Sequence, residues 1–411
     1  MTRHWLLGTR YFFLFLFFSL ILSGCTKKKS LSPQPVTLPR GKYEITKMAN
    51  GAIVSASVEH VASSNNALVI ADTRDACKLN LSLQVTIPSP ALTVVNLSAA
   101  TPEITKALPE LELMLSTKTN APFFTTLYEH KINSLGHQLS HLGELPSRDS
   151  LYDCQTILSL TNPKNNQHAL LVQAIMNVNT DGSDGDRNVS LEKLSSTYQP
   201  QTNYRWPKTS PHPNPNIPEL EKERALCQQS LSNTTLTSYQ KNKLQQKIEQ
   251  VDATLVELRR WSFLIGSADP FIVLPKFMLE RNNTQAASIG DYAVVLYKGI
   301  LYPAIVGDIG PPSKIGEASL RLCRAIDPKS GADRRPVDSP HVSYFIFPQS
   351  ADQPFRAPDY AHWSQRCHEL WSNFGGATNL TWHEWKNMEQ PWNVEKPVEE
   401  NDLEQLFDDI S

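Results

Sequence analysis

The chain has 411 residues, of which 40% are hydrophobic and 19% are charged, and its formal net charge is −2. This length allows two or three domains, and the composition is typical of a folded globular protein rather than a disordered one. The sequence pI is about 6.6, so the chain has no excess of positive charge to bind nucleic acid, and we expect no nucleic-acid partner.

The N-terminus has the pattern of a lipoprotein signal. Arg3 and Arg10 are followed by a twelve-residue apolar run, Tyr11–Leu22. That run is shorter than the roughly 20 residues of a membrane-spanning helix and is typical of the apolar region of a signal peptide. The tetrad Leu-Ser-Gly-Cys, which ends at Cys25, resembles the bacterial lipobox. The alternative is an ordinary signal peptide with a chance cysteine.

The lipobox resemblance implies a lipid anchor on Cys25, and therefore a membrane partner. Residues 1–24 would then be the signal peptide, and residues 25–40, which are rich in Lys, Ser and Pro, would be a tether. Thr26 rather than Asp follows the cysteine, which by the same resemblance implies a lipoprotein of the outer membrane in a bacterial cell envelope.

The remaining cysteines do not suggest a metal centre. Their number is odd, so in an oxidising compartment at least one thiol stays free or pairs between molecules. His137 and His141 are four residues apart and would share one helical face, but no Glu completes an HExxH motif. We therefore predict no metal and no cofactor. The pairing stays open among Cys77, Cys154, Cys227, Cys323 and Cys367.

The first part of the mature chain is expected to be β-rich. Residues 41–118 contain an alternating apolar run, Leu79–Ile87, and then a short helix predicted over Thr101–Lys118, with an interruption near Pro109. This region is either a structural β-layer, which we favour, or an accessory carbohydrate-binding domain. Phe123–Leu142 has the spacing of an amphipathic helix.

An acidic loop follows the next apolar strand, within Leu170–Arg187. It carries Asp181 and Asp184 among glycines. The pattern partly matches a calcium-binding loop, but Asn188 stands where the bidentate Glu is required. We therefore predict a tight acidic turn, either free-standing or lining a cleft.

A helical hairpin is predicted over residues 218–260, inserted before a second apolar region. Trp261–Leu279 contains two prolines and is expected to form short strands rather than a helix. Residues 375–411 form a tail with an acidic end that either docks as a short helix or stays disordered. Its tryptophans either stack on sugar rings or cap the domain edge, and they are Trp382, Trp385 and Trp392.

Two carboxylates frame a loop of Gly and Pro near the end of this region. Tyr292–Tyr297 and Ile300–Val306 are predicted strands, joined by a Lys-Gly turn. The loop that follows begins at Asp308 and ends at Glu317. This arrangement is typical of an acid/base pair, and the alternative is a pair of carboxylates that cap turns by accepting backbone N–H groups.

The segments SFLIGSADPFIVLP, GDYAVV, AIVGDIGP and KIGEASL, all within Ser262–Ile326, resemble the chitosanases of glycoside hydrolase family 75. A fainter match is MNVNTDGSDGDR. The resemblance implies a hydrolase domain over residues 119–374 in an α+β fold with a β-barrel core. The order of strands and Gly-rich loops also resembles double-psi β-barrels. By position, the family's catalytic pair corresponds to Asp308 and Glu317.

The family is inverting, so the resemblance implies that one carboxyl protonates the leaving oxygen and the other activates water. Apolar neighbours would raise the pKa of Glu317, so we assign it as the acid and Asp308 as the base. We predict that the substrate is bound by aspartates of the matching segments, namely Asp181, Asp184, Asp269 and Asp291.

The predicted function is an endo-acting, chitosanase-like hydrolase of a β-1,4-linked glucosamine polysaccharide. Asn177 and Asn179 stand where family members more often carry acidic residues, which leaves the substrate open because chitosan is polycationic. Two alternatives remain at this point. One is a lytic enzyme that acts on peptidoglycan, and the other is a lipoprotein that binds a polysaccharide without cleaving it.

Overall fold

The computed structural model describes residues 52–60, 77–85, 88–116, 122–141, 151–232, 236–279 and 285–389. The predictions for Cys25, the tether, Trp392 and the acidic end of the tail lie outside these ranges. The contacts between residues divide the protein into two compact units. One unit holds most of a two-stranded sheet of β1 (Ala52–His60) and β2 (Cys77–Val85). The other holds residues 85–411.

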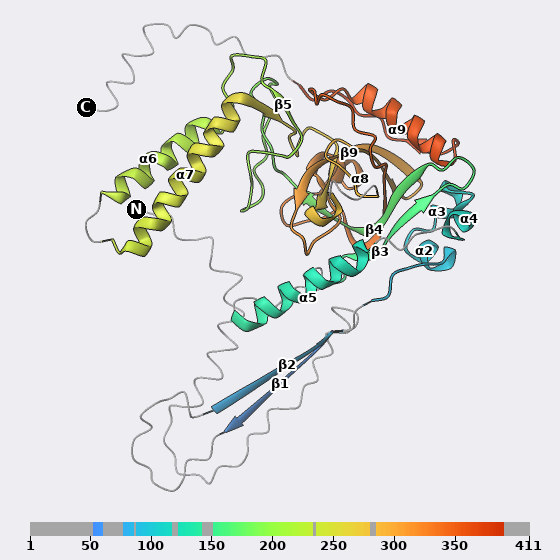
Figure 1. Cartoon of the computed structure of the whole chain (residues 1–411), viewed down its shortest axis with the longest axis horizontal. Helices are drawn as coiled ribbons and strands as arrows, with labels where there is room; N and C mark the ends of the chain where they lie inside the picture. The colour runs from blue at the N-terminus through green and yellow to red at the C-terminus, as the bar shows by residue number, and fades with distance from the viewer. Residues whose placement is uncertain are drawn as a thin grey trace. The chain divides into compact units, whose positions relative to one another are not determined.

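Six strands of the second unit close into a β-barrel (Figure 1). They are β4 (His168–Asn179), β7 (Phe271–Pro275), β8 (Tyr292–Tyr297), β9 (Ile300–Gly310), β10 (Glu317–Ser319) and β11 (Val337–Ile346). Their order is β10-β7-β9-β8-β11-β4, and β4 pairs again with β10, which closes the ring. The pairs β7–β9 and β4–β10 are parallel, and the others are antiparallel. The predicted α+β fold with a barrel core is confirmed.

The β8–β9 hairpin shows how local sequence sets the register. Lys298 and Gly299 have φ angles of 48° and 76°, the left-handed values that a two-residue hairpin turn needs at both positions. Tyr297 therefore pairs with Ile300, and the register continues to Tyr292 opposite Ile305. This register carries β9 past the predicted end at Val306, as far as Gly310.

Both faces of the barrel wall are buried, which explains why its strands read as continuous apolar runs. One face packs with α9 (Tyr360–Phe374), α2 (Val94–Ala100), α3 (Ile104–Ala107) and α4 (Leu111–Ser116). The other packs with α5 (Phe123–His141) and α8 (Leu320–Ile326). Strand β3 (Cys154–Thr161) extends the sheet beside β4, and β12 (Thr381–Trp382) pairs with β9.

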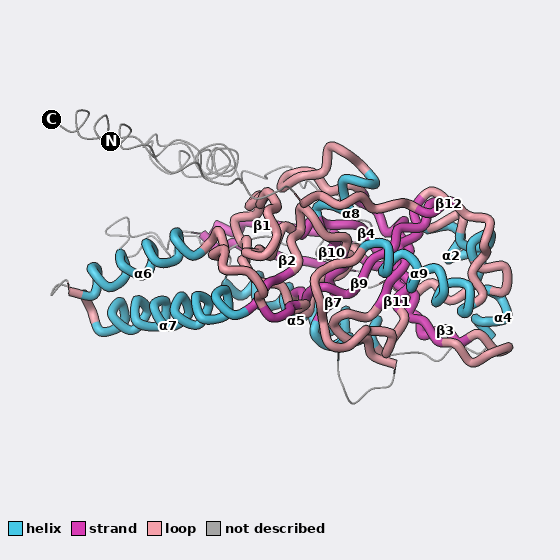
Figure 2. The backbone as a smooth tube through the Cα atoms, turned by 90° about the horizontal axis from the view of Figure 1, so that it is seen from above, coloured by secondary structure: helices cyan, strands magenta, loops and turns pink. Residues whose placement is uncertain are grey.

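The predicted helical hairpin is present as α6 (Ile217–Leu231) and α7 (Ser238–Arg260), which run side by side (Figure 2). Ion pairs such as Arg224–Asp252 and Lys247–Glu223 join the two helices. At the base of the hairpin, β5 (Arg205–Pro207) pairs with β6 (Trp261–Phe263). None of the described helices is long and apolar enough to cross a membrane.

The helix expected over Thr101–Lys118 is interrupted near Pro109, as predicted, but it does not begin at Thr101. This region contains the two short helices α3 and α4, and Thr101 ends α2 instead of starting a helix. Pro102 and Pro109 account for the division, because proline disfavours a helical residue before it and removes a backbone donor. Strand β3 was not predicted either.

The first two tryptophans of the tail cap the edge of the domain. The ring of Trp382 stacks on His368 with the centroids 3.7 Å apart. The indole N–H of Trp385 donates a hydrogen bond to the Pro303 carbonyl at 2.8 Å. Of the two interpretations of these residues, the structure therefore favours capping.

The described cysteine side chains form no disulfide. These residues are Cys154, Cys227, Cys323 and Cys367. Cys154, Cys323 and Cys367 are buried in the two clusters that cover the barrel wall.

Candidate active site

Strand register places Asp308 and Glu317 on the same side of the barrel wall. Asp308 of β9 pairs with Val273 of β7, and Glu317 of β10 pairs with the same Val273 from the other side. Residues in register on neighbouring strands point to the same face, and each strand spacing is about 4.8 Å. The two Cα atoms are thus separated by two strand spacings, or about 10 Å. Asp308 lies within β9, not in the loop where the sequence placed it.

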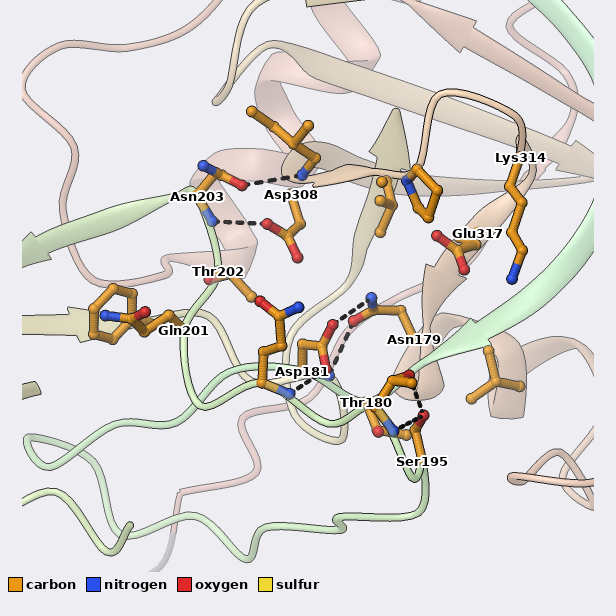
Figure 3. A pocket seen from close by; sticks show the side chains of 18 of the residues that line it. Asn179, Thr180, Asp181, Ser195, Gln201, Thr202, Asn203, Asp308, Lys314 and Glu317 are labelled. Carbon is orange, nitrogen blue, oxygen red and sulfur yellow. Dashed lines mark hydrogen bonds between the residues drawn. The ribbon is translucent and has the colours of Figure 1, made fainter. Parts of the chain in front are cut away.

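Both carboxyls face a cleft of about 630 Å³ (Figure 3). The floor of the cleft comes from the barrel, through Val273, and its rim comes from the loop 195–203 and the segment 309–314. Asp181, which follows β4, faces the same space as Asp308 and Glu317. Together with Glu257, these three carboxylates line one cavity.

Asp308 is buried, with 7% of its surface exposed, and its orientation is fixed by the backbone. The Asn203 N–H donates to Asp308 Oδ1 at 2.9 Å, and the Asn203 side chain in turn accepts from the Ile309 N–H at 3.2 Å. Burial raises the pKa of Asp308 to about 7, and the negative charges of Asp181 and Glu317 add to this effect. The backbone donors act in the opposite direction.

The Glu317 carboxyl has fewer hydrogen-bond donors around it than the Asp308 carboxyl. Burial raises the pKa of the Glu317 carboxyl above its ordinary value, whereas the Lys314 ammonium lowers it. Among the described residues, no hydrogen-bond donor contacts this carboxyl. Glu317 is partly buried, and partial burial without a donor favours the neutral acid, because the anion loses some of its water and gains no hydrogen bond in exchange.

Two glycines make room for Glu317. Gly316 has a φ of 83°, and a Cβ there would lie 2.3 Å from the Ile175 carbonyl oxygen. A Cβ at Gly310 would lie 3.0 Å from Glu317 Oε2. The first glycine allows the backbone to pass close to β4, and the second leaves space for the carboxyl itself.

Asp181 is held by its neighbours at the side of the cleft. The Gln199 N–H donates to Asp181 Oδ1 at 2.8 Å, and the Asn179 side chain donates to Oδ2 at 3.1 Å. Burial nevertheless raises the pKa of Asp181. Asn179 thus supports a carboxylate of the cleft through its side-chain amide.

The other three aspartates predicted to bind substrate do not line this cleft. Asp184 and Asp269 are buried and both pair with Arg187, at 2.6 and 2.7 Å. Asp291 is fully buried and accepts backbone N–H groups from Ser288 and residues 349–351. Their carboxylates are satisfied inside the protein and hold loops in place.

Sequence reasoning missed several residues of the cleft. Asn203 and its neighbours come from a Pro- and Asn-rich stretch in which no site residue was predicted. Arg205 and Glu257 form an ion pair at the base of the helical hairpin and also line the cleft. His137 is exposed on α5, and no cluster of three or more metal-ligating side chains occurs in the described ranges.

Comparison with known families agrees with this geometry. Residues 176–375 match the sequence model of a family described as the fungal chitosanases of glycosyl hydrolase group 75. This stretch is a group 75 glycosyl hydrolase domain. It contains every residue that lines the cleft, including Asp181, Asp308 and Glu317. The predicted resemblance is confirmed, and no curated protein matches the chain.

We predict that Asp269→Asn destabilises the protein rather than weakening saccharide binding. The substitution leaves Arg187 buried with a weakened partner, and breaking a buried ion pair costs about 3–5 kcal/mol. Urea denaturation measures the free energy of unfolding. Glu192→Gln is the control, because its ion pair with Arg324 is partly exposed and should contribute under about 1 kcal/mol. A weakened saccharide affinity at unchanged stability would contradict the structural role.

Proposed function

We propose that the group 75 domain hydrolyses a β-1,4-linked glucosamine polysaccharide of the chitosan type, with Glu317 as the acid and Asp308 as the base. The observation that carries the proposal is a buried carboxyl, Asp308, and a partly buried one, Glu317, both with raised pKa values, that face one cleft of a chitosanase-family domain. Enzymes that cleave glycosidic bonds with two carboxyls need one protonated and one ionised group at the same pH.

Hydrogen bonding supports the division of roles. Asp308 accepts the Asn203 N–H through Oδ1, which favours the anion and leaves the other oxygen for a water molecule. Glu317 has no such donor among the described residues, so its proton is available for the leaving oxygen. The raised pKa of Asp308, at about 7, means that this base is fully ionised only above neutral pH in the empty cleft.

The proposed reaction is a direct displacement with inversion. Glu317 gives its proton to the glycosidic oxygen as the bond from that oxygen to C1 breaks. Water attacks C1 from the opposite face, and its proton passes to Asp308. In inverting enzymes the two carboxyls lie about 6.5–9.5 Å apart to make room for that water. A Cα separation of two strand spacings, about 10 Å, is compatible with this range.

The charge of the cleft suits a cationic sugar chain. Four lining residues are acidic, namely Asp181, Glu257, Asp308 and Glu317, against two basic ones, Arg205 and Lys314. The difference, four minus two, leaves an excess of two acidic groups. Glu257 and Arg205 pair with each other, so Asp181 is the acidic group best placed to bind an ammonium group of glucosamine.

We predict that Asp308→Asn and Glu317→Gln each lower kcat on chitosan by about 10²–10⁴-fold, the contribution usual for a general acid or base. Reducing-end assays measure the rate, and NMR of the first product measures the anomer, which should be α. Asp338→Asn is the matched control, because Asp338 is exposed on β11, away from the cleft.

Other results would point to the alternatives. Full hydrolysis by both variants would contradict the assignment of the pair. Anhydro-sugars released from peptidoglycan would indicate a lytic transglycosylase. Binding of a polysaccharide by the wild-type protein without any cleavage would indicate a non-catalytic envelope protein.

We predict an acidic limb near pH 7 in the profile of kcat/KM. Asp308 must be ionised to act as the base, and its pKa in the free enzyme is about 7, so kcat/KM should fall as the pH drops below this value. A bound ammonium group lowers the pKa of a nearby carboxyl, so the limb in kcat should lie at a lower pH. A loss of activity above pH 7 that disappears in Asp308→Asn would instead make Asp308 the acid.

We also propose that the enzyme is anchored by a lipid on Cys25 in the bacterial outer membrane. The lipobox-like tetrad and the short apolar run before it support this proposal. Cys25→Ala should abolish incorporation of labelled palmitate. The variant should be found either in the soluble fraction or as a precursor with its signal peptide uncleaved. Equal labelling of the variant and the wild-type protein would contradict a lipid anchor at this residue.

A further inference from the structure

A buried ion pair lies just outside the group 75 domain and directly behind its active-site loop. Lys131 is on α5, and Asp153 immediately precedes β3. Their side chains are 0% and 1% exposed, and Nζ lies 2.7 Å from Oδ2. Both residues precede position 176, where the family match begins.

The pair holds the segment that leads to Glu317. Lys131 Nζ donates a hydrogen bond to the Ser313 carbonyl at 2.7 Å. The Ile315 N–H donates to Asp153 Oδ2 at 3.2 Å. These two contacts fix the backbone on both sides of Lys314, immediately before the candidate acid.

The same pair is connected to the strand beside Glu317. The Asp153 carbonyl accepts the Ile175 N–H of β4 at 2.9 Å. Two residues further along β4, the Asn177 N–H donates to the Gly316 carbonyl at 2.7 Å. The segment 313–316 is thus held between the ion pair and β4.

We propose that Lys131 and Asp153 are positioning residues for Glu317. They fix the approach of the 313–316 segment, and the charge of Asp153 helps to keep Glu317 in its acid form. The proposal rests on the proposed role of Glu317. It also extends the working active site beyond the group 75 domain, into α5 and the segment before β3.

Stability alone does not account for this pair. A buried ion pair is often no more stabilising than apolar residues of the same volume. Asp153 Oδ1 is buried and has no hydrogen-bond partner among the described residues, which is a further cost. The contacts of the pair converge on the segment before Glu317, so its benefit is expected in the geometry and charge of the active site.

Electrostatics agrees with the proposed role. Burial and Asp181 raise the pKa of Glu317, Lys314 lowers it, and Asp153 raises it further. The groups that face Glu317 from every packed element are Asp308 from β9, Asp181 from the loop after β4, Lys314 from its own segment, Cys323 from α8, and the pair Lys131 and Asp153. Burial raises the pKa of Asp153 itself to about 6, against the effect of Lys131.

A second ion pair provides a matched control. Lys208 and Asp186 are 9% and 8% exposed, and their charged atoms lie 3.2 Å apart. Asp186 accepts N–H groups of Thr209 and Ser210, so this pair also fixes a loop through the backbone. Neither residue lines the cleft, and the loop that the pair fixes is residues 208–210.

The test compares Asp153→Asn and the double variant Lys131→Met/Asp153→Asn with Lys208→Met/Asp186→Asn. The double variants leave no lone buried charge, so they should fold even where a single substitution does not. We expect the Asp153 variants to lower kcat about 10–100-fold with KM changed by less than about twofold, because displacement by about 1 Å costs rates of this order. In Asp153→Asn the alkaline limb of kcat/KM should move to lower pH, because Glu317 loses a neighbouring negative charge while the Lys131 ammonium stays. In the double variant, which also removes the Lys131 charge, the limb should move less.

Two readouts are independent of turnover. Hydrogen exchange should become faster at the Ile315 amide, and NMR of ¹³C-labelled glutamate, with Glu317→Gln for assignment, should show a lower pKa for Glu317. If the enzyme cleaves none of the tested saccharides, these two changes still support positioning while the proposed function fails. Unchanged exchange and an unchanged Glu317 pKa in the Asp153 variants, or equal changes in the Lys208 control, would overturn the proposal.

Discussion

The pairing of one three-residue strand determines the site. Strand β10 pairs in parallel with β4 and antiparallel with β7, and these two pairings close the barrel. Glu317 is the first residue of that strand and takes part in both pairings, opposite Asn177 and Val273. Because Val273 also pairs with Asp308, closure of the barrel and alignment of the two carboxyls depend on the same register.

Burying the carboxyls of the cleft has a cost in stability, which their proposed function explains. Burial raises the pKa of Asp308, Glu317 and Asp181, so ionising them is less favourable in the folded protein than in the unfolded chain. Asp184, Asp269 and Asp291 are buried more deeply, yet each is satisfied by an arginine or by several backbone N–H groups. Burial raises the pKa of Asp291 as well, so a raised pKa alone does not mark the site. What distinguishes Asp308, Glu317 and Asp181 is that their carboxyls face one cleft.

The sequence was sufficient for the candidate pair but not for the whole site. Asp308 and Glu317 lie in short segments with Gly and Pro at fixed offsets, and such local patterns are readable without a structure. Asp269 and Asp291 lie in equally recognisable segments, but whether an aspartate meets Arg187, a loop amide or a cleft depends on contacts across the fold. Asn203 is missed for the same reason, since it meets Asp308 from 105 residues away.

The boundary of the hydrolase domain is set by contacts within the fold and not by the extent of sequence similarity. The family match begins at Met176, although β4 begins at His168, so the first eight of its twelve residues precede the match. Those eight residues pair with β3 and with β11, and β11 is one of the six barrel strands. A chain that started at residue 176 would therefore lack most of one wall of the barrel. Lys131 and Asp153 support Glu317 for the same reason. A closed barrel needs all of its strands, so the part of the chain before residue 176 also helps to build the site.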